Sequence, residues 1–232
     1  MRIAVLTASI GANDLSEPTK DLPGWSGVDY YAFVDENKMG VQGGLWNRQL
    51  AFQFSSDPSF GNRRNAKIYK ILPHLFVPDY DYYIWIDSTH QIAQSPQSII
   101  NKYLQESDIA LFKHPERNCI GAEAEVIKQV NFDHHNLVDE QMNFYFGYER
   151  YPSNNGLYEL PCRIQRNSRK VQEAMLLWWE QICMFSSRDQ LSLPYVLWKT
   201  GIKPAIMPGK ANGLWQNDIL PQYTTSTHSR NV

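Results

Sequence analysis

The chain of 232 residues is 43% hydrophobic and 20% charged, as in a soluble globular protein, and its formal net charge is −2. This small charge provides no basic field for nucleic acid or an anionic membrane, so neither is an expected partner. No stretch approaches the ~20 consecutive apolar residues of a membrane span, and the length suits a single domain over residues 1–232.

Apolar periodicity and turn residues divide the chain into strands that alternate with helices. In chain order we predict strand 2–8, strand 29–35, helix 62–72, strand 82–86, helix 95–104, strand 108–112, helix 122–130, helix 139–146, a strand within 157–165, helix 169–185, helix 188–200 and strand 203–207. Residues 82–86 (YYIWI) lack polar alternation, which is typical of a central strand covered on both faces. The order of elements predicts an α/β fold with a mostly parallel sheet and helices on both faces.

The cysteines and the first residues bear on the cellular compartment. Cys119, Cys162 and Cys183 are isolated, odd in number and without a CxxC pair. This pattern argues against a disulfide framework or a structural zinc site and indicates a reducing compartment. The apolar run at residues 2–8 is too short for a signal peptide. We therefore expect a cytoplasmic protein.

Polar residues follow the predicted central strand in the stretch 83–91 (YIWIDSTHQ). Ligands of open α/β sheets bind at the carboxyl ends of the strands, where Asp87 lies. A divalent cation that bridges a diphosphate takes one or two protein carboxylates, and Asp87, Thr89 and His90 offer ligand atoms close together. The alternative is an aspartate that only begins a turn by bonding its own backbone.

The densest group of cations lies in helix 62–72 and just after it, at Arg63, Arg64, Lys67, Lys70 and His74. At helical spacing four of them (all but Arg64) share one face, which suits a diphosphate or another anionic leaving group. A helix face that is merely solvated is the alternative.

Two further segments carry possible chemistry. His114, Arg117 and Glu123 come just past strand 108–112, and a His-Pro step fixes an extended backbone at His114. Glu123 can also be explained as an acidic residue in the first turn of a helix. Asp189 ends the helix-start signature SSRD, so it either caps its own helix or serves as a general base kept ionised at the helix N-terminus.

The segments above, taken together, resemble one family. They are Lys67-x-x-Lys70, Pro73-His74, residues 80–87 (YDYYIWID), His114-Pro115-x-Arg117-x-Cys119, Glu123-Ala124 and residues 187–192 (SRDQLS). The family is glycosyltransferase-like and was long described only as a domain of unknown function. It occurs in plant Golgi proteins linked to wall and mucilage polysaccharides, and in bacterial and viral polysaccharide enzymes. The resemblance runs from about residue 64 to residue 192.

This resemblance implies a GT-A type of fold, with a Rossmann-like sheet and a D-x-D motif after a central strand. Mn²⁺ or Mg²⁺ would bind there to the diphosphate of a nucleotide-sugar donor. Asp87 matches the first aspartate of D-x-D, whereas Thr89 stands in place of the second. Either His90 or the late His228 would then complete the metal site, or the metal would bind weakly.

The resemblance also implies roles for the remaining residues. Arg64 and Lys67 would hold the diphosphate with Asp87 and the metal, and Thr7 and Asp35 would contact the nucleoside. His114, Arg117 and Glu123 would shape the pocket for the donor sugar or the acceptor. Asp189 would be the base that deprotonates an acceptor hydroxyl. The expected reaction moves a hexose from a nucleotide-diphosphate sugar, a UDP-sugar first, to a glycan acceptor.

Two other classes of function remain open at this point. A metal-dependent hydrolase would use Asp87, His90 and His114 around an activated water, although such enzymes usually need three closely spaced ligands. A non-catalytic carbohydrate-binding domain is favoured only by the aromatic content of 13%. The sequence has no GxSxG, P-loop, HExxH or GxGxxG motif, which excludes the commonest serine hydrolases, P-loop NTPases, zincins and dinucleotide oxidoreductases.

Overall fold

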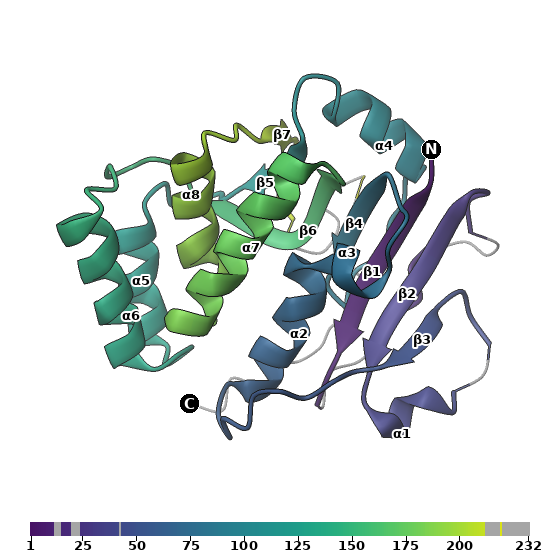
Figure 1. The fold of residues 1–232 in the computed structure, drawn as a ribbon, viewed down its shortest axis with the longest axis horizontal. Helices are drawn as coiled ribbons and strands as arrows, with labels where there is room; N and C mark the ends of the chain where they lie inside the picture. Colours follow the sequence, from purple (N-terminus) through teal and green to yellow (C-terminus); the bar gives the residue numbers. More distant parts are fainter. Residues whose placement is uncertain (12–14, 20–23, 42, 212–218, 220–232) are drawn as a thin grey trace.

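The computed structural model describes residues 1–11, 15–19, 24–41, 43–211 and 219. Its centre is a seven-stranded sheet in the order β3-β2-β1-β4-β6-β5-β7 (Figure 1). The strands are β1 (Ile3–Ser9), β2 (Val28–Val34), β3 (Asn47–Leu50), β4 (Tyr82–Ile86), β5 (Ile109–Lys113), β6 (Tyr158–Arg166) and β7 (Ala205–Met207). Only β6 runs antiparallel to its neighbours, β4 and β5, so the prediction of a mostly parallel α/β sheet is confirmed.

Helices pack on both faces of this sheet, as predicted. They are α1 (Glu36–Met39), α2 (Gly61–Ile71), α3 (Pro73–Phe76), α4 (Pro96–Tyr103), α5 (Ile120–Gln129), α6 (His135–Met142), α7 (Arg169–Met184) and α8 (Asp189–Thr200), with a π-helical segment η1 (Asn143–Tyr148) after α6. Because side chains alternate along a strand, Ile3 and Val5 of β1 pack in one core with Ile99 of α4. Ala4 and Leu6 pack on the opposite face.

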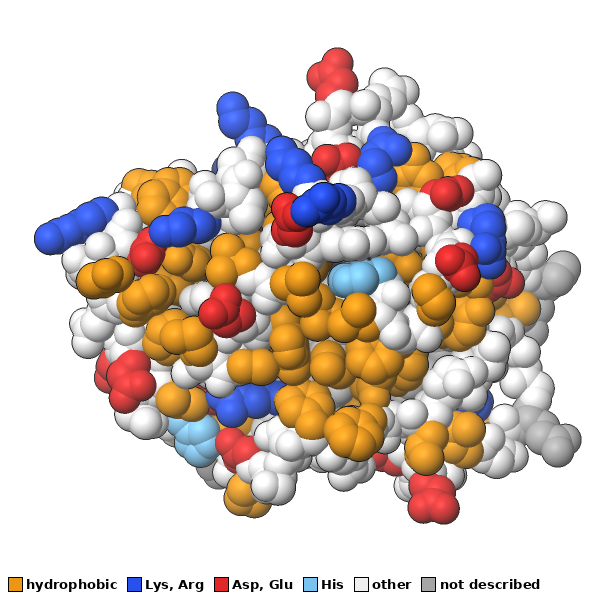
Figure 2. Space-filling view, viewed as in Figure 1, with side chains coloured by type: hydrophobic (Ala, Val, Ile, Leu, Met, Phe, Trp, Pro, Cys, Tyr) orange, Lys and Arg blue, Asp and Glu red, His pale blue; other side chains and the backbone are white. Residues whose placement is uncertain are grey.

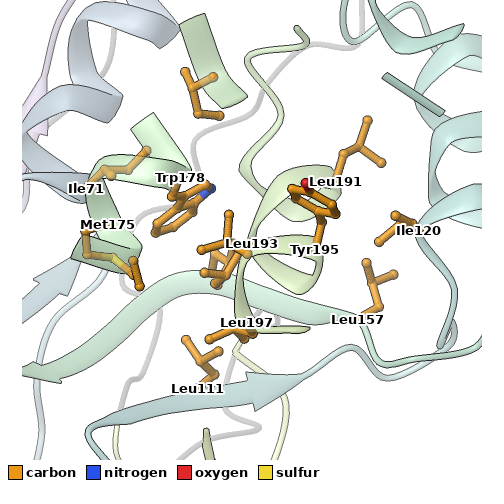
Figure 3. Close-up of a cluster of buried hydrophobic side chains, with 14 of the residues drawn as sticks. Ile71, Leu111, Ile120, Leu157, Met175, Trp178, Leu191, Leu193, Tyr195 and Leu197 are labelled. Atoms are coloured by element: carbon orange, nitrogen blue, oxygen red, sulfur yellow. The ribbon is translucent and has the colours of Figure 1, made fainter. Parts of the chain in front are cut away.

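The largest core cluster joins α7 and α8 to the sheet. Trp178 of α7 is fully buried and lies near Ile71 of α2 and Leu193 of α8 (Figure 3). Burying each large apolar side chain contributes about 1.5–3 kcal/mol. The indole nitrogen of Trp178 donates a hydrogen bond to Ser192 Oγ at 2.9 Å, so its one polar group is also satisfied. This packing fixes the first turn of α8 against the sheet.

The structure differs from the predicted elements mainly at β3. This strand (NRQL) has no apolar alternation because it lies at the sheet edge, where it pairs with β2 alone and stays largely exposed. The predicted helix 139–146 is instead α6 followed by η1, starting at His135. The short helices α1 and α3 were not predicted, since four residues show no periodicity.

The molecular surface over α2, α3 and α7 gathers many hydrophobic side chains (Figure 2). Exposed large apolar side chains on these elements include Leu75, Leu176 and Met184, each at least half exposed. Within the described residues, no helix combines the length and the apolar character needed to cross a bilayer.

Candidate active site

The carboxyl ends of β1, β2, β4 and β5 meet at one edge of the sheet, because β6 is antiparallel to both β4 and β5. Asp35, Asp87 and His114 each directly follow one of these strands. The antiparallel strand β6 begins at the same edge, and its Pro161 carbonyl accepts the Asp87 N–H at 2.7 Å. The edge therefore brings together polar residues from distant parts of the chain, as the sequence predicted.

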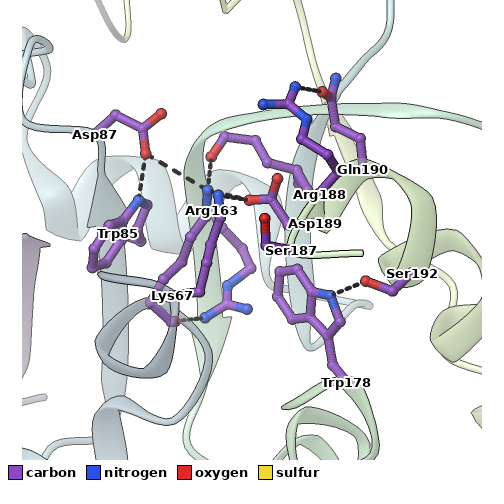
Figure 4. A network of polar contacts seen from close by, with 12 residues as sticks. Lys67, Trp85, Asp87, Arg163, Trp178, Ser187, Arg188, Asp189, Gln190 and Ser192 are labelled. Carbon is purple, nitrogen blue, oxygen red and sulfur yellow. Dashed lines mark hydrogen bonds and ion pairs between the residues drawn. The ribbon is translucent and has the colours of Figure 1, made fainter. Parts of the chain in front are cut away.

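A cavity of about 180 Å³ opens at this edge between α2, β4, the start of β6 and the start of α8. It is lined by Lys67, Lys70, Asp87, Leu160, Pro161, Arg188, Asp189 and Gln190. Three of these side chains are cationic and two are carboxylates, so one positive charge is in excess. Figure 4 shows the lysine and aspartate side chains converging on the space between the helices and the sheet.

Asp189 is held by both lysines of the cavity. Its Oδ2 atom lies 2.6 Å from Lys67 Nζ and 2.7 Å from Lys70 Nζ. Lys67 and Lys70 are three residues apart on α2, so they project from one helix face, as the sequence predicted. The Lys70 side chain is 1% exposed, donates to the Leu160 carbonyl and lies 3.6 Å from Asp87 Oδ1. Lys70 thus links the two carboxylates.

The pKa values of Asp189 and Lys67 are both lowered, but for different reasons. Burial alone would raise the pKa of Asp189, but the charges of Lys67, Lys70 and Arg188 outweigh it and hold that pKa far below its usual range. Burial lowers the pKa of Lys67 to about 8, although Asp189 partly compensates. Asp189 is therefore an ionised carboxylate. It is a weak proton acceptor as long as both lysines hold it.

The alternative role of Asp189 as a helix cap is not what the structure shows. Asp189 is the first residue of α8, and no side chain caps that helix. The preceding turn is held by Asp133, which is 2% exposed. Its Oδ2 accepts hydrogen bonds from Ser187 N, Ser187 Oγ and Ser186 Oγ at 2.6 to 2.9 Å. Asp133 thus positions the turn that carries Arg188 and Asp189 into the cavity.

A buried guanidinium lies beneath the lysines. Arg163 of β6 is 1% exposed, donates to the backbone carbonyl of Lys70, and has its guanidinium carbon 4.9 Å from the centroid of the Trp178 ring (Figure 4). Burial lowers its pKa to about 9, and Asp189 opposes that shift. Arg163 adds positive charge below the cavity and supports the backbone of α2 at Lys70.

Asp87 keeps one oxygen available. Oδ1 accepts a hydrogen bond from Trp85 Nε1 at 2.7 Å, whereas Oδ2 has no hydrogen-bond partner among the described residues. The side chain is 44% exposed. Burial acts to raise its pKa, but Lys70, Lys67 and His90 lower it more, so the carboxylate is ionised. The free oxygen can bind a ligand or a cation.

Thr89 and His90 share a turn with Asp87. The His90 N–H donates to the Asp87 carbonyl at 2.9 Å, and His90 Nδ1 lies 3.2 Å from Thr89 Oγ1. His90 Nε2 is buried and has no hydrogen-bond partner in the described part of the chain. His228 lies outside the described residues. Within those residues, no group of three or more His, Cys, Asp or Glu side chains could hold a metal.

The donor set still suits a weakly held Mg²⁺ or Mn²⁺. Such ions often take one or two protein ligands and complete their shell with phosphate oxygens and water. The second oxygen of the Asp87 carboxylate is available, and Thr89 and the buried His90 lie in the same turn. The ammonium of Lys70 lies 3.6 Å from Asp87 Oδ1 and opposes a cation here.

The predicted nucleoside contacts lie at the ends of β1 and β2. Asp35 Oδ2 accepts the Gly11 N–H at 2.6 Å, and Lys38 Nζ donates to the carbonyls of Ser9 and Gly11 at 3.0 and 2.8 Å. Asp35 and Lys38 therefore order the loop after β1. Thr7 is fully buried within β1, where it presents no side-chain surface to a ligand.

Arg64 points away from the cavity. Its guanidinium donates to the Phe185 carbonyl at 2.6 Å, at the C-terminal end of α7, and it does not line the cavity. Lys70, predicted from the sequence to lie on the diphosphate-binding face of the helix, lines the cavity, and so do Arg188 and Gln190, for which no role was predicted. The sequence could have indicated all three, because Lys70 shares the helix face of Lys67, and Arg188 and Gln190 flank Asp189.

His114, Arg117 and Glu123 form a separate cluster at the end of β5. Arg117 Nε donates to Glu123 Oε2 at 2.7 Å, and His114 Nδ1 accepts the Arg117 N–H at 3.0 Å. Burial and the Arg117 charge lower the pKa of His114. None of the three lines the 180 Å³ cavity. Since His114 is engaged here, the ligand trio of the alternative hydrolase is not assembled among the described residues.

Sequence comparisons point to one group of proteins. The sequence model of the family described as TOD1/MUCI70, glycosyltransferase-like domain, matches residues 15–209. The probable hexosyltransferase MUCI70 of Arabidopsis thaliana is 27% identical over 197 residues, which is 76% of this chain. The chain spans 33% of the length of that relative.

Proposed function

Because the chain belongs to the TOD1/MUCI70 glycosyltransferase-like family, we propose that it transfers a hexose from a nucleotide-diphosphate sugar to a glycan hydroxyl. The observation that carries this proposal is the cationic cavity at the carboxyl edge of the sheet. Glycosyl transfer leaves negative charge on the departing diphosphate, so fixed positive charge at that point lowers the barrier. A UDP-sugar is the first donor to test.

The diphosphate is proposed to bind between α2 and α8. Lys67, Lys70 and Arg188 supply charge-assisted donors from two sides of the cavity. Lys70 and Arg163 are almost fully buried, so their fields are screened less by water than those of surface cations. The net positive charge of the lining favours a multiply charged anion over a neutral ligand.

Asp189 is proposed to change its partners when the donor binds. In the free protein it neutralises Lys67 and Lys70. A diphosphate in the cavity competes for the same ammonium groups, and a carboxylate that loses cationic contacts regains basicity. Asp189 can then accept the proton of an acceptor hydroxyl, so the base becomes effective only with the donor in place.

Asp87 is proposed to hold a divalent cation with the donor. The free Oδ2 atom, with His90 Nε2 and Thr89 Oγ1 as further candidates, would form the protein part of the shell. Bound Mn²⁺ or Mg²⁺ supplies additional positive charge to the leaving diphosphate. The lysines remain as the resident charge of the site.

Thermal shift with nucleoside diphosphates and nucleotide sugars, each with and without Mn²⁺, tests this proposal. A ligand at 100 times its Kd adds about 2.7 kcal/mol, which raises the melting temperature by a few degrees. We expect one nucleotide to stabilise the protein and Mn²⁺ to enlarge the effect. Asp87→Asn should remove the Mn²⁺ increment, whereas the exposed control Asp139→Asn on α6 should retain it. The absence of any nucleotide-dependent shift would overturn the proposed function.

A further inference from the structure

A second and larger cavity, of about 340 Å³, lies at the opposite end of β2. It is lined by Gly24, Trp25, Val28, Asp29, Tyr30, Tyr31, Leu45 and Asn47. Strand β3 pairs with β2 only from Tyr31 onward, so the edge of β2 before that residue has no β3 partner. Asp29 and Asp35 are six residues apart along an extended strand, or about 20 Å. The cavity is therefore well separated from the candidate active site.

Aromatic and aliphatic side chains form the walls of this cavity. Trp25 and Leu45 are partly exposed, and the Trp25 N–H donates to Tyr30 Oη at 3.2 Å. Tyr30 in turn packs edge-to-face on Trp46, with ring centroids 6.2 Å apart at 87°. These contacts tie the aromatic wall to the core, so its shape exists before a ligand binds. Rigid aromatic surface offers a large contact area at low entropic cost.

Two polar residues, Asp29 and Asn47, also line this cavity. Tyr31 Oη and Tyr80 Oη are 2.8 Å apart, and Tyr80 Oη donates to Asp29 Oδ2 at 2.7 Å. This relay orients the Asp29 carboxylate and uses only one of its oxygens. Asn47 Oδ1 accepts from Gln49 Nε2 at 2.8 Å, which leaves the two N–H donors of Asn47 for another partner. The cavity thus offers one fixed acceptor and one donor group beside an apolar wall.

The charge of the lining selects against anions. Among the described residues that line it, Asp29 carries the sole formal charge, and no Lys, Arg or His contributes. A neutral hydroxylated ring can donate to Asp29 and accept from Asn47. The C–H faces of such a ring match the aromatic wall.

We propose that this cavity binds a neutral hexose unit of a glycan chain, as a sugar site distinct from the candidate active site. Its volume lies within the range of small-ligand pockets, and its few fixed polar groups amid aromatic surface fit one pyranose ring. Such a site would favour long glycans, because one unit can be anchored here while another part of the chain reaches the opposite edge.

Isothermal titration calorimetry with neutral oligosaccharides tests the inference without any donor or turnover. The probes are hexaoses of glucose, mannose and galactose, titrated up to millimolar concentrations. We expect at least one to bind, and Trp25→Ala to weaken it by about 10-fold or more, which corresponds to 1.4 kcal/mol. Trp198→Ala on α8, whose side chain is 37% exposed, is the matched control and should bind normally.

A second variant guards against unfolding, because Trp25 also packs on the core. Asn47 is exposed, and Asn47→Ala should weaken the same oligosaccharide several-fold while the melting temperature stays constant. Both variants should bind nucleoside diphosphates as the wild type does, which separates this site from the proposed function. If no neutral hexaose binds, or if binding survives both substitutions unchanged, the inference is overturned.

Discussion

The two cavities of this fold hold their polar groups by different means. In the smaller one, Lys67 and Lys70 share the buried carboxylate of Asp189, so each charge is the counter-ion of another. In the larger one, a hydrogen-bond relay from Tyr31 through Tyr80 orients the single carboxylate of Asp29. In the first arrangement, an anionic ligand could replace Asp189 as the partner of the two ammonium groups. The second presents neutral hydrogen-bonding groups whose positions do not depend on a counter-ion.

The size of each cavity does not indicate how many ionised groups line it. The cationic cavity has about half the volume of the aromatic one, yet most of the ionised groups are in the smaller. Buried cations are costly without a partner, so such a cluster remains only where carboxylates or a ligand compensate it. The ionised groups thus gather at the carboxyl edge of the sheet, whereas the cavity at the opposite end of β2 has a mainly neutral lining among the described residues.

Removing the charge of the buried Lys70 should give the largest difference in effect between the two cavities. Lys70→Met keeps the length of the side chain but deletes the charge that links Asp189 to Asp87. We expect the rate of glycosyl transfer to fall by about 10²–10³-fold, the magnitude typical of losing one transition-state donor. Binding of neutral oligosaccharides should not change. Single-turnover kinetics and calorimetry measure the two effects.

The control for this experiment is Lys170→Met, a substitution at an exposed lysine of α7. Because Lys70 is buried, circular dichroism must first show that the variant is folded. Lys67→Met provides a second test, since its side chain is 15% exposed and its loss leaves Lys70 with Asp189. Transfer rates within about threefold of wild type in both variants would contradict the role given to the lysines.

The sequence predicted local features of the fold well and long-range pairings poorly. The strand 82–86 was predicted with the observed bounds, because an unbroken apolar run marks a central strand. The edge strand β3 was missed, since its polar residues pair on one side only. Asp87 could be placed at a strand end from sequence alone. Leu160 and Pro161 of β6, its neighbours in the cavity, could not be predicted, because periodicity does not show which strands lie side by side.

The same limit applies to the candidate site. The shared face of Lys67 and Lys70 follows from helical spacing, but their contact with Asp189 spans more than 100 positions of the chain. Asp133 was missed for a similar reason, because the serines before α8 match a local helix-start signature. In the structure those serines bond to Asp133, more than 50 residues earlier.

A change of pH should affect only the cationic cavity. The pKa of Lys67 is lowered to about 8, so its ammonium is present below that pH and is lost as the pH rises through it. Asp189 stays ionised throughout because its pKa lies far below the ordinary value. We expect nucleoside diphosphate binding without metal to weaken by up to about 10-fold between pH 7.5 and 9. Calorimetry at several pH values measures this change.

Lys67→Met should flatten this dependence, and neutral oligosaccharide binding in the aromatic cavity should be constant over the same range. The interval starts at pH 7.5 so that the phosphate groups of the ligand are already ionised. Tighter binding at high pH would show that the ammonium of Lys67 does not face the anion.

Ionic strength should give the smallest contrast between the two cavities. Raising the salt from 0.05 to 0.5 M shortens the screening length, which weakens exposed charge interactions more than buried ones. Since Lys70 is 1% exposed, we expect diphosphate binding to fall only a few-fold. Neutral oligosaccharide binding should stay constant. Equal salt effects at both cavities would contradict the assignment of an uncharged ligand to the aromatic one.

The position of β6 between β4 and β5 has a consequence for biosynthesis. Lys67, Lys70 and Asp87 are translated before Pro161 and Asp189, which complete the lining of the 180 Å³ cavity. Until then, α2 has no carboxylate from α8 to receive its ammonium groups. The closing of loops this long slows folding, because their entropy is lost before the contacts form. The lining of this cavity is therefore complete only after α8 has been translated.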